Sequence, residues 1–566
     1  MGYPLSGSAK CSHTIRIVHV FGFRASNPPR QTNMPKPSTG ERSSLSANKA
    51  AATPLSVYFA DNAAKEGHGR QSLRSGASAI FGRGASLVIQ IASTVFLARL
   101  LMPEDFGVFA MMAALTSLTP VLMDLGTRDA AVQKTHITTA EISALFWFTL
   151  GIGICLALAT ALCSSVIARF FHESRLENIA LVWTLTFIFS ALSLQHTALL
   201  RRAMMFDKIN MIEVGANLFG AISAIVLAFT GFGYWALVVR PLLTALVYTV
   251  GVWLSCPWIP GLPRMSAGVK EMLTFGAQVT IFALTDAIGR SIDRIALGHT
   301  RGAEELGHYQ NASALYESPL GIFNSLHSVA VASLSKLKDN LDELRRTWSI
   351  ALSSLTFFSM PIFVMLAVTG PDIAVLLLGG KWLYAGTILS VVAMRGPAHV
   401  VERTHGWLHL AAGRPDRWMY WGGISSLVQV CAVFCGLPFG TMGVAIAYTV
   451  CMYVLFLPAV AYSGRPFGID VSCVIRVVGP QLAGALCAAV IGFLLRDTYL
   501  SDASVLARIV ILAFICLVSY LIVTVGLFRL VKPLEVAGSL LSDSLPARFQ
   551  QLLTAGLAHV GRKQGL

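Results

Sequence analysis

Charged residues are scarce in this chain. Asp, Glu, Lys and Arg make up only 13% of its 566 residues, which is about half the usual share for a globular protein. Hydrophobic residues make up 55%. A soluble protein with so few charges could not cover its own surface, so most of this surface must face lipid. The composition excludes a soluble enzyme and a single-pass receptor, and it predicts a protein that crosses the membrane many times.

Paired metal-binding cysteines are also missing. The ten cysteines contain no Cys-x-x-Cys pair, and several lie inside apolar segments. Cys431 and Cys435 share a helix face, but two thiols are too few for a structural metal site. We therefore expect the cysteines to be small buried fillers, and we expect neither a metal nor a cofactor.

The first 75 residues differ from the rest of the chain. They are rich in Ser, Pro, Asn and Ala, and they carry ten Lys or Arg residues against three acids. Their only apolar run, Ile15 to Phe23, is too short for a membrane span and lacks the features of a secretory signal. We expect residues 1–75 to be a disordered basic cytoplasmic tail, in which Met34 offers an alternative start.

Apolar segments of about twenty residues recur from Ser78 onward, and each is long enough to cross about 30 Å of hydrocarbon as a helix. The breaks between them are short, which excludes a folded soluble domain. The sequence therefore predicts an all-α polytopic membrane protein with about fourteen transmembrane helices. They are expected at residues 79–101, 106–126, 142–165, 179–199, 211–230, 233–255, 273–297, 307–330, 347–370, 384–410, 418–436, 440–462, 474–495 and 505–528.

The distribution of Lys and Arg predicts the orientation of these helices. If the N-terminus is cytoplasmic, the basic clusters at residues 201–208, 336–346 and 414–417 all fall in cytoplasmic loops, and the opposite loops hold few basic residues. Cytoplasmic loops of membrane proteins carry an excess of Lys and Arg. We therefore expect both ends to be cytoplasmic, with residues 531–566 forming a C-terminal tail.

Two alignments within the chain indicate an internal repeat. Residues 104–109 (EDFGVF) match residues 304–309 (EELGHY), 200 positions later, and Asp207-Lys208 matches Asp416-Arg417 at an offset of 209. Six predicted helices separate the copies. Because six is even, the two copies point the same way across the membrane, as in parallel repeats related by an axis along the membrane normal.

The repeat predicts the domain organisation. We expect a six-helix lobe at residues 76–262, a second at 263–465 in parallel pseudo-repeat, and a cavity between them. Two additional helices, at residues 466–530, lie outside the repeat.

Ionisable residues inside predicted spans mark candidate functional positions, because a charge in a membrane normally faces protein or water. The seventh span carries Asp286, Arg290, Asp293 and Arg294 along one helix stripe. Two interpretations are open. The stripe either lines the central cavity or forms an ion ladder that pairs with itself and docks the helix against its neighbours.

The tenth span carries a second stripe with Arg395, His399, Glu402 and Arg403, interrupted by Pro397. A proline kink frees backbone carbonyls, which membrane transporters tolerate where a helix lines a cavity. Two arginines on such a helix suit an anionic substrate, because guanidinium binds phosphate in a bidentate way. The alternative is that Glu402 and Arg403 lie at the inner interface and merely extend into it, a possibility that is also open for Arg395.

Three single charges complete the set of candidates: Arg83 in the first span, Arg240 in the sixth and Glu317 in the eighth. Arg83 lies near enough to the cytoplasmic end to extend into the interface. Glu317 has no local partner, so it either pairs with an arginine of the seventh span or acts as an acid that couples transport to protons.

Residues 97–107 (LARLLMPEDFG) resemble the signature that follows the first helix of polysaccharide transporter proteins, the Wzx-type flippases and their exopolysaccharide exporter relatives. The resemblance runs from about residue 72 to 530. Further matching segments are residues 199–202, 293–298, 307–309 and 413–416.

The resemblance implies membership of the superfamily that joins multidrug exporters, oligosaccharide-lipid flippases and polysaccharide exporters. Members of this superfamily have two six-helix lobes around a V-shaped cavity that opens to alternate sides, and some add two C-terminal helices. Characterised relatives move a polyprenyl-diphosphate-linked oligosaccharide to the outer leaflet of the inner membrane. The resemblance therefore implies a non-enzymatic flippase for exopolysaccharide, capsule or lipopolysaccharide synthesis.

Arg290, Arg294 and Arg395 are the residues expected to neutralise the diphosphate, with Asp286 and Asp293 releasing it or coupling it to ions. The driving force is Na+, H+ or the membrane potential. The expected partners are the lipid-linked oligosaccharide, membrane lipid, and a polysaccharide polymerase with its chain-length machinery. Nucleic acid is not expected.

Three alternatives stay open. A multidrug exporter of the same fold would favour an acidic or aromatic cavity, and a peptidoglycan-precursor flippase would use similar chemistry. A membrane glycan polymerase or transferase would need larger outside loops than this chain has.

Overall fold

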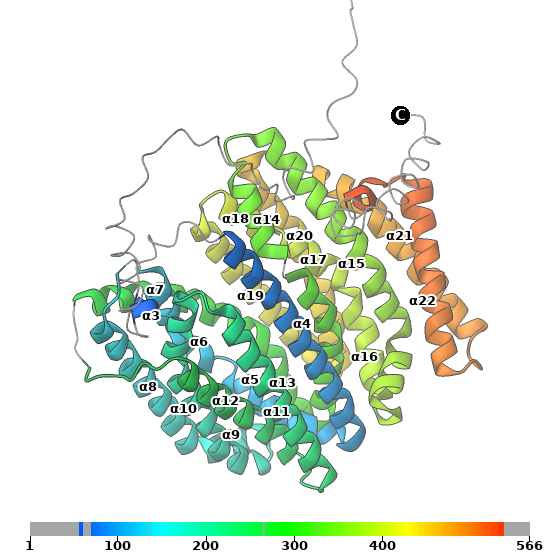
Figure 1. Ribbon diagram of the computed structural model, residues 1–566. Coiled ribbons are helices and arrows are strands. Elements are labelled where there is room, and N and C mark those ends of the chain that lie inside the picture. Colours follow the sequence, from blue (N-terminus) through cyan, green and yellow to red (C-terminus); the bar gives the residue numbers. More distant parts are fainter. Residues whose placement is uncertain (1–55, 60–68, 135, 264–266, 325, 537–566) are drawn as a thin grey trace, which may run out of the picture.

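The computed structural model describes residues 56–59, 69–134, 136–263, 267–324 and 326–536, which form a bundle of helices joined by short turns (Figure 1). Most of residues 1–75 and 531–566, which we expected to be tails, lie outside these ranges. The helices are α3 (Ser56–Phe59), α4 (Gly69–Leu100), α5 (Pro103–Thr116), α6 (Thr119–Asp124), α7 (Thr127–Gln133), α8 (Thr139–Leu162), α9 (Ser164–Phe171), α10 (Arg175–Arg202), α11 (Phe206–Phe229), α12 (Trp235–Ser255), α13 (Ala267–Asn324), α14 (Leu326–Ser335), α15 (Leu341–Leu378), η2 (Gly380–Trp382), α16 (Leu383–Met394), α17 (Gly396–Arg403), α18 (His405–Ala411), α19 (Pro415–Gly436), η3 (Leu437–Phe439), α20 (Gly440–Gly464), η4 (Arg465–Phe467), α21 (Val471–Thr498), α22 (Val505–Leu521) and the short π-helix η5 (Ile522–Leu527).

Ten helical segments of the described residues are long and apolar enough to cross a membrane. One of them, Asp416–Phe467, contains both α19 and α20 and breaks at Gly440, where φ is 77°. The charged helix α13 is not among the ten, although its 58 residues also form two helices, joined at Gly302. The backbone there has φ 82° and ψ −173°, a conformation that is essentially restricted to glycine. The helical membrane fold is therefore confirmed, while the number fourteen stays a prediction.

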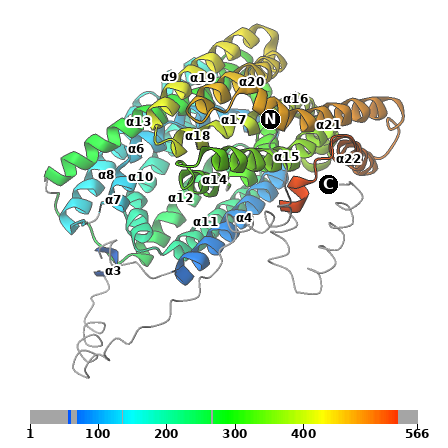
Figure 2. The same cartoon turned by 90° about the horizontal axis from the view of Figure 1, so that it is seen from above.

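Several helices of the two halves of the chain lie on different sides of the bundle, but α4 lies between them and α13 packs against α5 of the first half. In Figures 1 and 2, α8, α10 and α12 lie on one side, α15, α16 and α20 on the other, and α21 and α22 at the far edge. Large side chains such as Trp348, Phe363 and Leu145 are completely buried between helices.

Several cysteines depart from expectation. Cys256, Cys451 and Cys516 are buried, but Cys155, Cys163, Cys431 and Cys435 are exposed on the bundle surface. Helix surfaces of a membrane protein can carry weakly polar thiols because lipid covers them. The interpretation of all cysteines as buried fillers is therefore wrong for these four.

The two halves of the chain meet backbone to backbone where α5 crosses the part of α13 that follows Gly302. A Cβ atom on Gly107 would lie 1.6 Å from the carbonyl oxygen of Ala303, and one on Gly307 would lie 1.9 Å from the carbonyl oxygen of Pro103. In the 200-residue repeat, Gly307 corresponds to Gly107 and Ala303 corresponds to Pro103. Each contact is therefore the repeat equivalent of the other. The matched sequence segments thus make equivalent contacts across one crossing.

Further bonds join the halves at this end of the bundle, which we call the contact end and define by residues 97–107, 298–307 and 376–382. The Arg99 guanidinium donates to the carbonyls of Leu376 (2.6 Å) and Leu377 (3.0 Å). The Lys381 ammonium donates to the Leu101 carbonyl (2.5 Å), and Trp382 Nε1 donates to Ala98 (2.8 Å). These donors satisfy carbonyls at helix C-termini, which have no partner within the helix.

A buried ion triad fixes α21 and α22 to α15. Asp372 is only 4% exposed, and its two carboxylate oxygens lie 2.8 Å from Arg508 Nη2 and 3.6 Å from Arg496 Nε. The Tyr520 hydroxyl of α22 also donates to the Phe357 carbonyl of α15. The two C-terminal helices are therefore bonded to the second half of the chain.

Candidate functional site

The charges predicted on three separate spans come together in the second half of the chain. They lie on both parts of α13 and on α17, and α20 packs against α13 and α17. Within the stripe of α13, the neighbouring charges Asp293 and Arg294 attract one another. Both also contact residues that follow Gly302, so these contacts join the two parts of α13.

The two neighbouring charges Asp293 and Arg294 have different partners. Asp293 is 8% exposed, and one of its oxygens accepts a hydrogen bond from the hydroxyl of the fully buried Tyr309 (2.7 Å). The other accepts from the Arg294 backbone N–H (2.8 Å). The Arg294 side chain reaches Glu317, with Nη2 3.3 Å from Oε1. Glu317 thus pairs with an arginine of the seventh predicted span, one of the two possibilities open from sequence.

Arg395 is buried between two aromatic rings. Its side chain is 5% exposed, and its guanidinium carbon lies 4.4 Å from the ring centre of Tyr316 and 4.8 Å from that of Tyr448. Each such contact contributes about 2 kcal/mol when water is excluded. Among the described residues, Arg395 forms no ion pair, and its Nε and Nη1 have no hydrogen-bond partner. The site therefore holds a buried cation with unused donors.

A break between α16 and α17 positions this arginine. The chain leaves α16 at Met394 and begins α17 at Gly396, with Pro397 at the start of the new helix. The Met394 carbonyl accepts a hydrogen bond from the Tyr453 hydroxyl of α20 (2.8 Å). The expected proline break is present, and a neighbouring helix bonds to backbone that the break exposes.

His399 links the α17 stripe to Tyr316. The Arg403 Nε–H donates to His399 Nε2 (3.2 Å), and His399 Nδ1 lies 2.8 Å from the Tyr316 hydroxyl. Arginine can only donate, so Nε2 must be the acceptor and Nδ1 carries the proton in the neutral ring. One polar network therefore runs from Arg403 to the ring that covers Arg395.

The other predicted residues are distributed as follows. Arg290 is exposed and interacts electrostatically with Arg403 and Glu317. Asp286 belongs to α13, but its side chain lies outside the part of the chain that the structure describes. Arg83 in α4 is exposed and Arg240 in α12 is partly buried. They belong to the first half of the chain and form no ion pair among the described residues.

Sequence reasoning missed the tyrosines. Tyr309, Tyr316 and Tyr448 surround the charges, and Tyr448 also donates to Gln429 of α19 (3.1 Å). Their spacing gave one available signal, because Tyr309 and Tyr316 are seven residues apart and therefore share one helix face. The buried acid Asp372 was missed as well, although it stands alone in an apolar segment.

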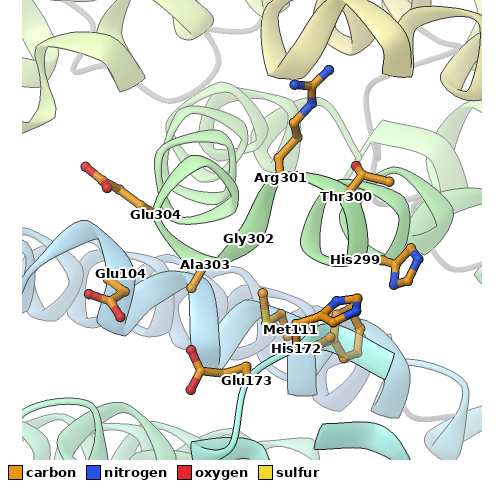
Figure 3. A pocket seen from close by; sticks show the side chains of 11 residues that line it. Glu104, Met111, His172, Glu173, His299, Thr300, Arg301, Gly302, Ala303 and Glu304 are labelled. Atoms are coloured by element: carbon orange, nitrogen blue, oxygen red, sulfur yellow. The ribbon is translucent and has the colours of Figure 1, made fainter. Parts of the chain in front are cut away.

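A separate cavity of about 440 Å³ lies at the contact end, under the α13 kink (Figure 3). Glu104, Glu173 and Glu304 line it together with His172 and His299. Arg175 bonds both Glu104 and Glu173. The hydrogen bonds that Arg175 donates to the Glu173 carboxylate lower the pKa of Glu173 below its ordinary value. Partial burial of Glu173 acts in the opposite direction but is the smaller effect. No group of His, Cys, Asp or Glu among the described residues is arranged to hold a metal ion.

Comparison with known proteins places this arrangement in context. Residues 96–386 match the family described as polysaccharide biosynthesis protein. The teichuronic acid biosynthesis protein TuaB of Bacillus subtilis (strain 168) is 25% identical over 385 residues, which cover 65% of this chain and 77% of TuaB. The lipopolysaccharide biosynthesis protein WzxC of Escherichia coli (strain K12) is 25% identical over 327 residues, covering 56% of this chain and 66% of WzxC.

Among solved structures, the lipid II flippase MurJ in an inward closed conformation is similar, with a TM-score of 0.64 and 17% sequence identity. The similarity covers 81% of this chain and 99% of MurJ. At this level of identity the similarity establishes the fold alone.

Proposed function

The chain belongs to the family of polysaccharide biosynthesis proteins, and from this premise we propose that it is a flippase. It moves a polyprenyl-diphosphate-linked oligosaccharide from the inner to the outer leaflet of the bacterial inner membrane, for synthesis of exopolysaccharide, capsule or lipopolysaccharide. The roles of TuaB and WzxC in polysaccharide biosynthesis support this proposal, as does the fold that the chain shares with the lipid II flippase MurJ. The protein does no chemistry on its substrate.

The buried guanidinium of Arg395 is the observation that carries the proposal. A charge at membrane depth costs about 2.5–3.5 kcal/mol or more, and each unsatisfied buried donor costs a further ~1–3 kcal/mol. The tyrosine faces offset only part of this cost. A diphosphate would supply the missing counter-charge and accept from both unused nitrogens, because guanidinium and phosphate match in a bidentate geometry. An organic cation would add to the unfavourable charge.

The transport cycle that we propose is alternating access of two lobes, residues 76–262 and 263–465, with residues 466–530 as two additional helices in a total of fourteen. The exchanged glycine contacts of the contact end support an axis between the lobes. The basic clusters at residues 201–208, 336–346 and 414–417 lie in loops away from the contact end, which supports a contact end that faces the outside and termini that lie in the cytoplasm. The described conformation is then closed to the outside.

Within this cycle, Arg290, Arg294 and Arg395 neutralise the diphosphate during transit. Asp293 and Glu317 are the acids of the described site that couple transport to Na+, H+ or the membrane potential. The product is delivered to the polysaccharide polymerase and its chain-length machinery.

A deletion strain tests the function directly. We expect loss of the surface or secreted polysaccharide, together with accumulation of the polyprenyl-linked oligosaccharide in membrane extracts. Complementation with Arg395→Gln should leave both defects in place at wild-type protein level. Arg465→Gln, which removes the same charge from the exposed turn η4, is the matched control and should restore the polymer.

Unchanged glycan with increased sensitivity to cationic drugs would contradict the proposal and assign the protein to multidrug export. Full complementation by Arg395→Gln would instead keep the flippase and remove Arg395 from the substrate site.

A further inference from the structure

The ion pair between Arg294 and Glu317 differs from the other contacts of the site. Its atoms are 3.3 Å apart, longer than the 2.7–2.9 Å of an optimal charge-assisted hydrogen bond. The Glu317 side chain is 56% exposed, whereas that of Arg294 is 23% exposed. Arg294 Nε is buried and has no hydrogen-bond partner in the described part of the chain. One accessible acid therefore contacts one partly buried cation through a single long ion pair, with Asp293 as that cation's other charged neighbour.

The neighbouring acid is held much more firmly. Asp293 is 8% exposed and accepts from both the Tyr309 hydroxyl and a backbone N–H at 2.7 and 2.8 Å. Moving it would leave the buried Tyr309 hydroxyl without its acceptor, at a cost of about 1–3 kcal/mol. Glu317 has no other hydrogen bond or ion pair within the described residues. Of these two acids, Glu317 is the one that can leave Arg294 at little cost.

We propose that Glu317 is an internal counter-ion that competes with the substrate's diphosphate for Arg294. In the empty protein it neutralises this arginine together with the adjacent Asp293, whose carboxylate also attracts Arg294. An arriving diphosphate offers oxygens to Arg294 Nη2 and to the unused Nε together, so it displaces the single carboxylate contact. Glu317 returns to Arg294 as the substrate leaves. The proposal rests on the proposed function, since it assigns a release step to the same site.

The competition predicts that loss of the Glu317 charge strengthens substrate binding but slows transport. Removing the charge of Glu317 removes the competitor, so the diphosphate binds more tightly and leaves more slowly. A transporter needs both binding and release, so tighter binding lowers the export rate. A residue that merely stabilised the fold, or that contacted the substrate favourably, would weaken both binding and export when changed.

The experiment uses the full chain reconstituted in lipid nanodiscs, with undecaprenyl diphosphate as the probe and undecaprenol as the neutral reference lipid. We expect Glu317→Gln to lower the Kd for undecaprenyl diphosphate about tenfold, which corresponds to about 1.4 kcal/mol. Its dissociation rate should fall by a similar factor, while undecaprenol binding stays unchanged. Export by the same variant in the deletion strain should decrease.

A double-mutant cycle locates the effect at Arg294. Arg294→Gln should weaken probe binding, and the double variant should bind no more tightly than Arg294→Gln alone. Glu317→Asp keeps the charge but shortens the side chain by one methylene, so its Kd should fall between wild type and Glu317→Gln. Asp339→Asn, an exposed acid in the turn between α14 and α15, is the matched control and should bind the probe as wild type does.

The outcomes separate the two proposals. Equal or weaker probe binding by a folded Glu317→Gln or Glu317→Asp variant would overturn the counter-ion role, provided that wild type prefers undecaprenyl diphosphate over undecaprenol. Persistence of the tenfold gain in the double variant would also overturn it. A wild-type protein without that preference would overturn the proposed function itself.

Discussion

Closure of the contact end should depend on the absence of a side chain at Gly107. The substitution Gly107→Ala adds a single methyl group, and its Cβ would lie 1.6 Å from the Ala303 carbonyl oxygen. Backbone carbon and oxygen atoms normally approach to about 3.3 Å, so α5 and α13 must separate by ~1.7 Å at the crossing. The obstacle is backbone, which cannot rotate away as a side chain could.

The free-energy penalty that Gly107→Ala places on the closed contact end can be estimated from the cost of overpacking. Forcing extra atoms into a packed contact costs about 1–3 kcal/mol. In the proposed cycle this cost applies only while the contact end is closed, because the crossing would be relieved when the two halves separate. A bias of 1–3 kcal/mol changes a conformational equilibrium about 5- to 150-fold. We therefore expect Gly107→Ala to populate a state that is open at the contact end and to reduce export.

Spin labels on the two halves measure this shift. Exposed Phe232, in the turn after α11, and exposed Phe439, in η3, are suitable positions once the native cysteines are replaced by serine. Double electron–electron resonance should show a longer distance population in Gly107→Ala than in the parent. Gly215→Ala in α11 is the matched control, because a Cβ there meets no atom within 4 Å.

An unchanged distance distribution in Gly107→Ala, together with normal export, would refute the reasoning. So would an equal shift in Gly215→Ala, since the effect would then come from helix propensity and not from the crossing.

Three further predictions concern charges elsewhere in the molecule. Arg395→Lys keeps the charge but loses the planar fork, so export should fall even though the charge is retained, as a comparison of polymer yield at equal protein level would show. Asp372→Asn leaves two arginines without their buried acid and should destabilise the protein by about 3–5 kcal/mol, visible as a lower melting temperature, whereas the exposed Asp502→Asn should leave it unchanged. The hydrogen bonds from Arg175 keep the pKa of Glu173 below its ordinary 4.5, so the stabilisation from this pair is complete above pH 4.5 and is lost as the pH falls through the lowered pKa. Glu173→Gln should remove that pH dependence of the melting temperature, and an identical pH profile in the variant would contradict the assignment.

The charges of the candidate site were visible in the sequence, but their partners were not. Asp293 and Arg294 are neighbours in one motif, and nothing in their spacing indicates that one bonds Tyr309 and the other Glu317. The proline break at residue 397 was predictable, because proline cannot continue the hydrogen bonding of a helix. The two rings that enclose Arg395 come from different helices, and helix rotation places them there.

The sequence by itself determined that this chain is a helical membrane protein and where many of its helices run, and it predicts that the two halves repeat. Those properties follow from hydropathy and spacing, which are local and can be read residue by residue. The tertiary structure alone decided which helix faces meet. It brought both parts of α13 together with α17 and α20, left Arg395 without an ion pair among the described residues, and placed Gly107 and Gly307 at one helix crossing. Side-chain partners between helices depend on packing over the whole bundle, because rotating one helix by a single residue position turns each side chain by about 100° toward another neighbour.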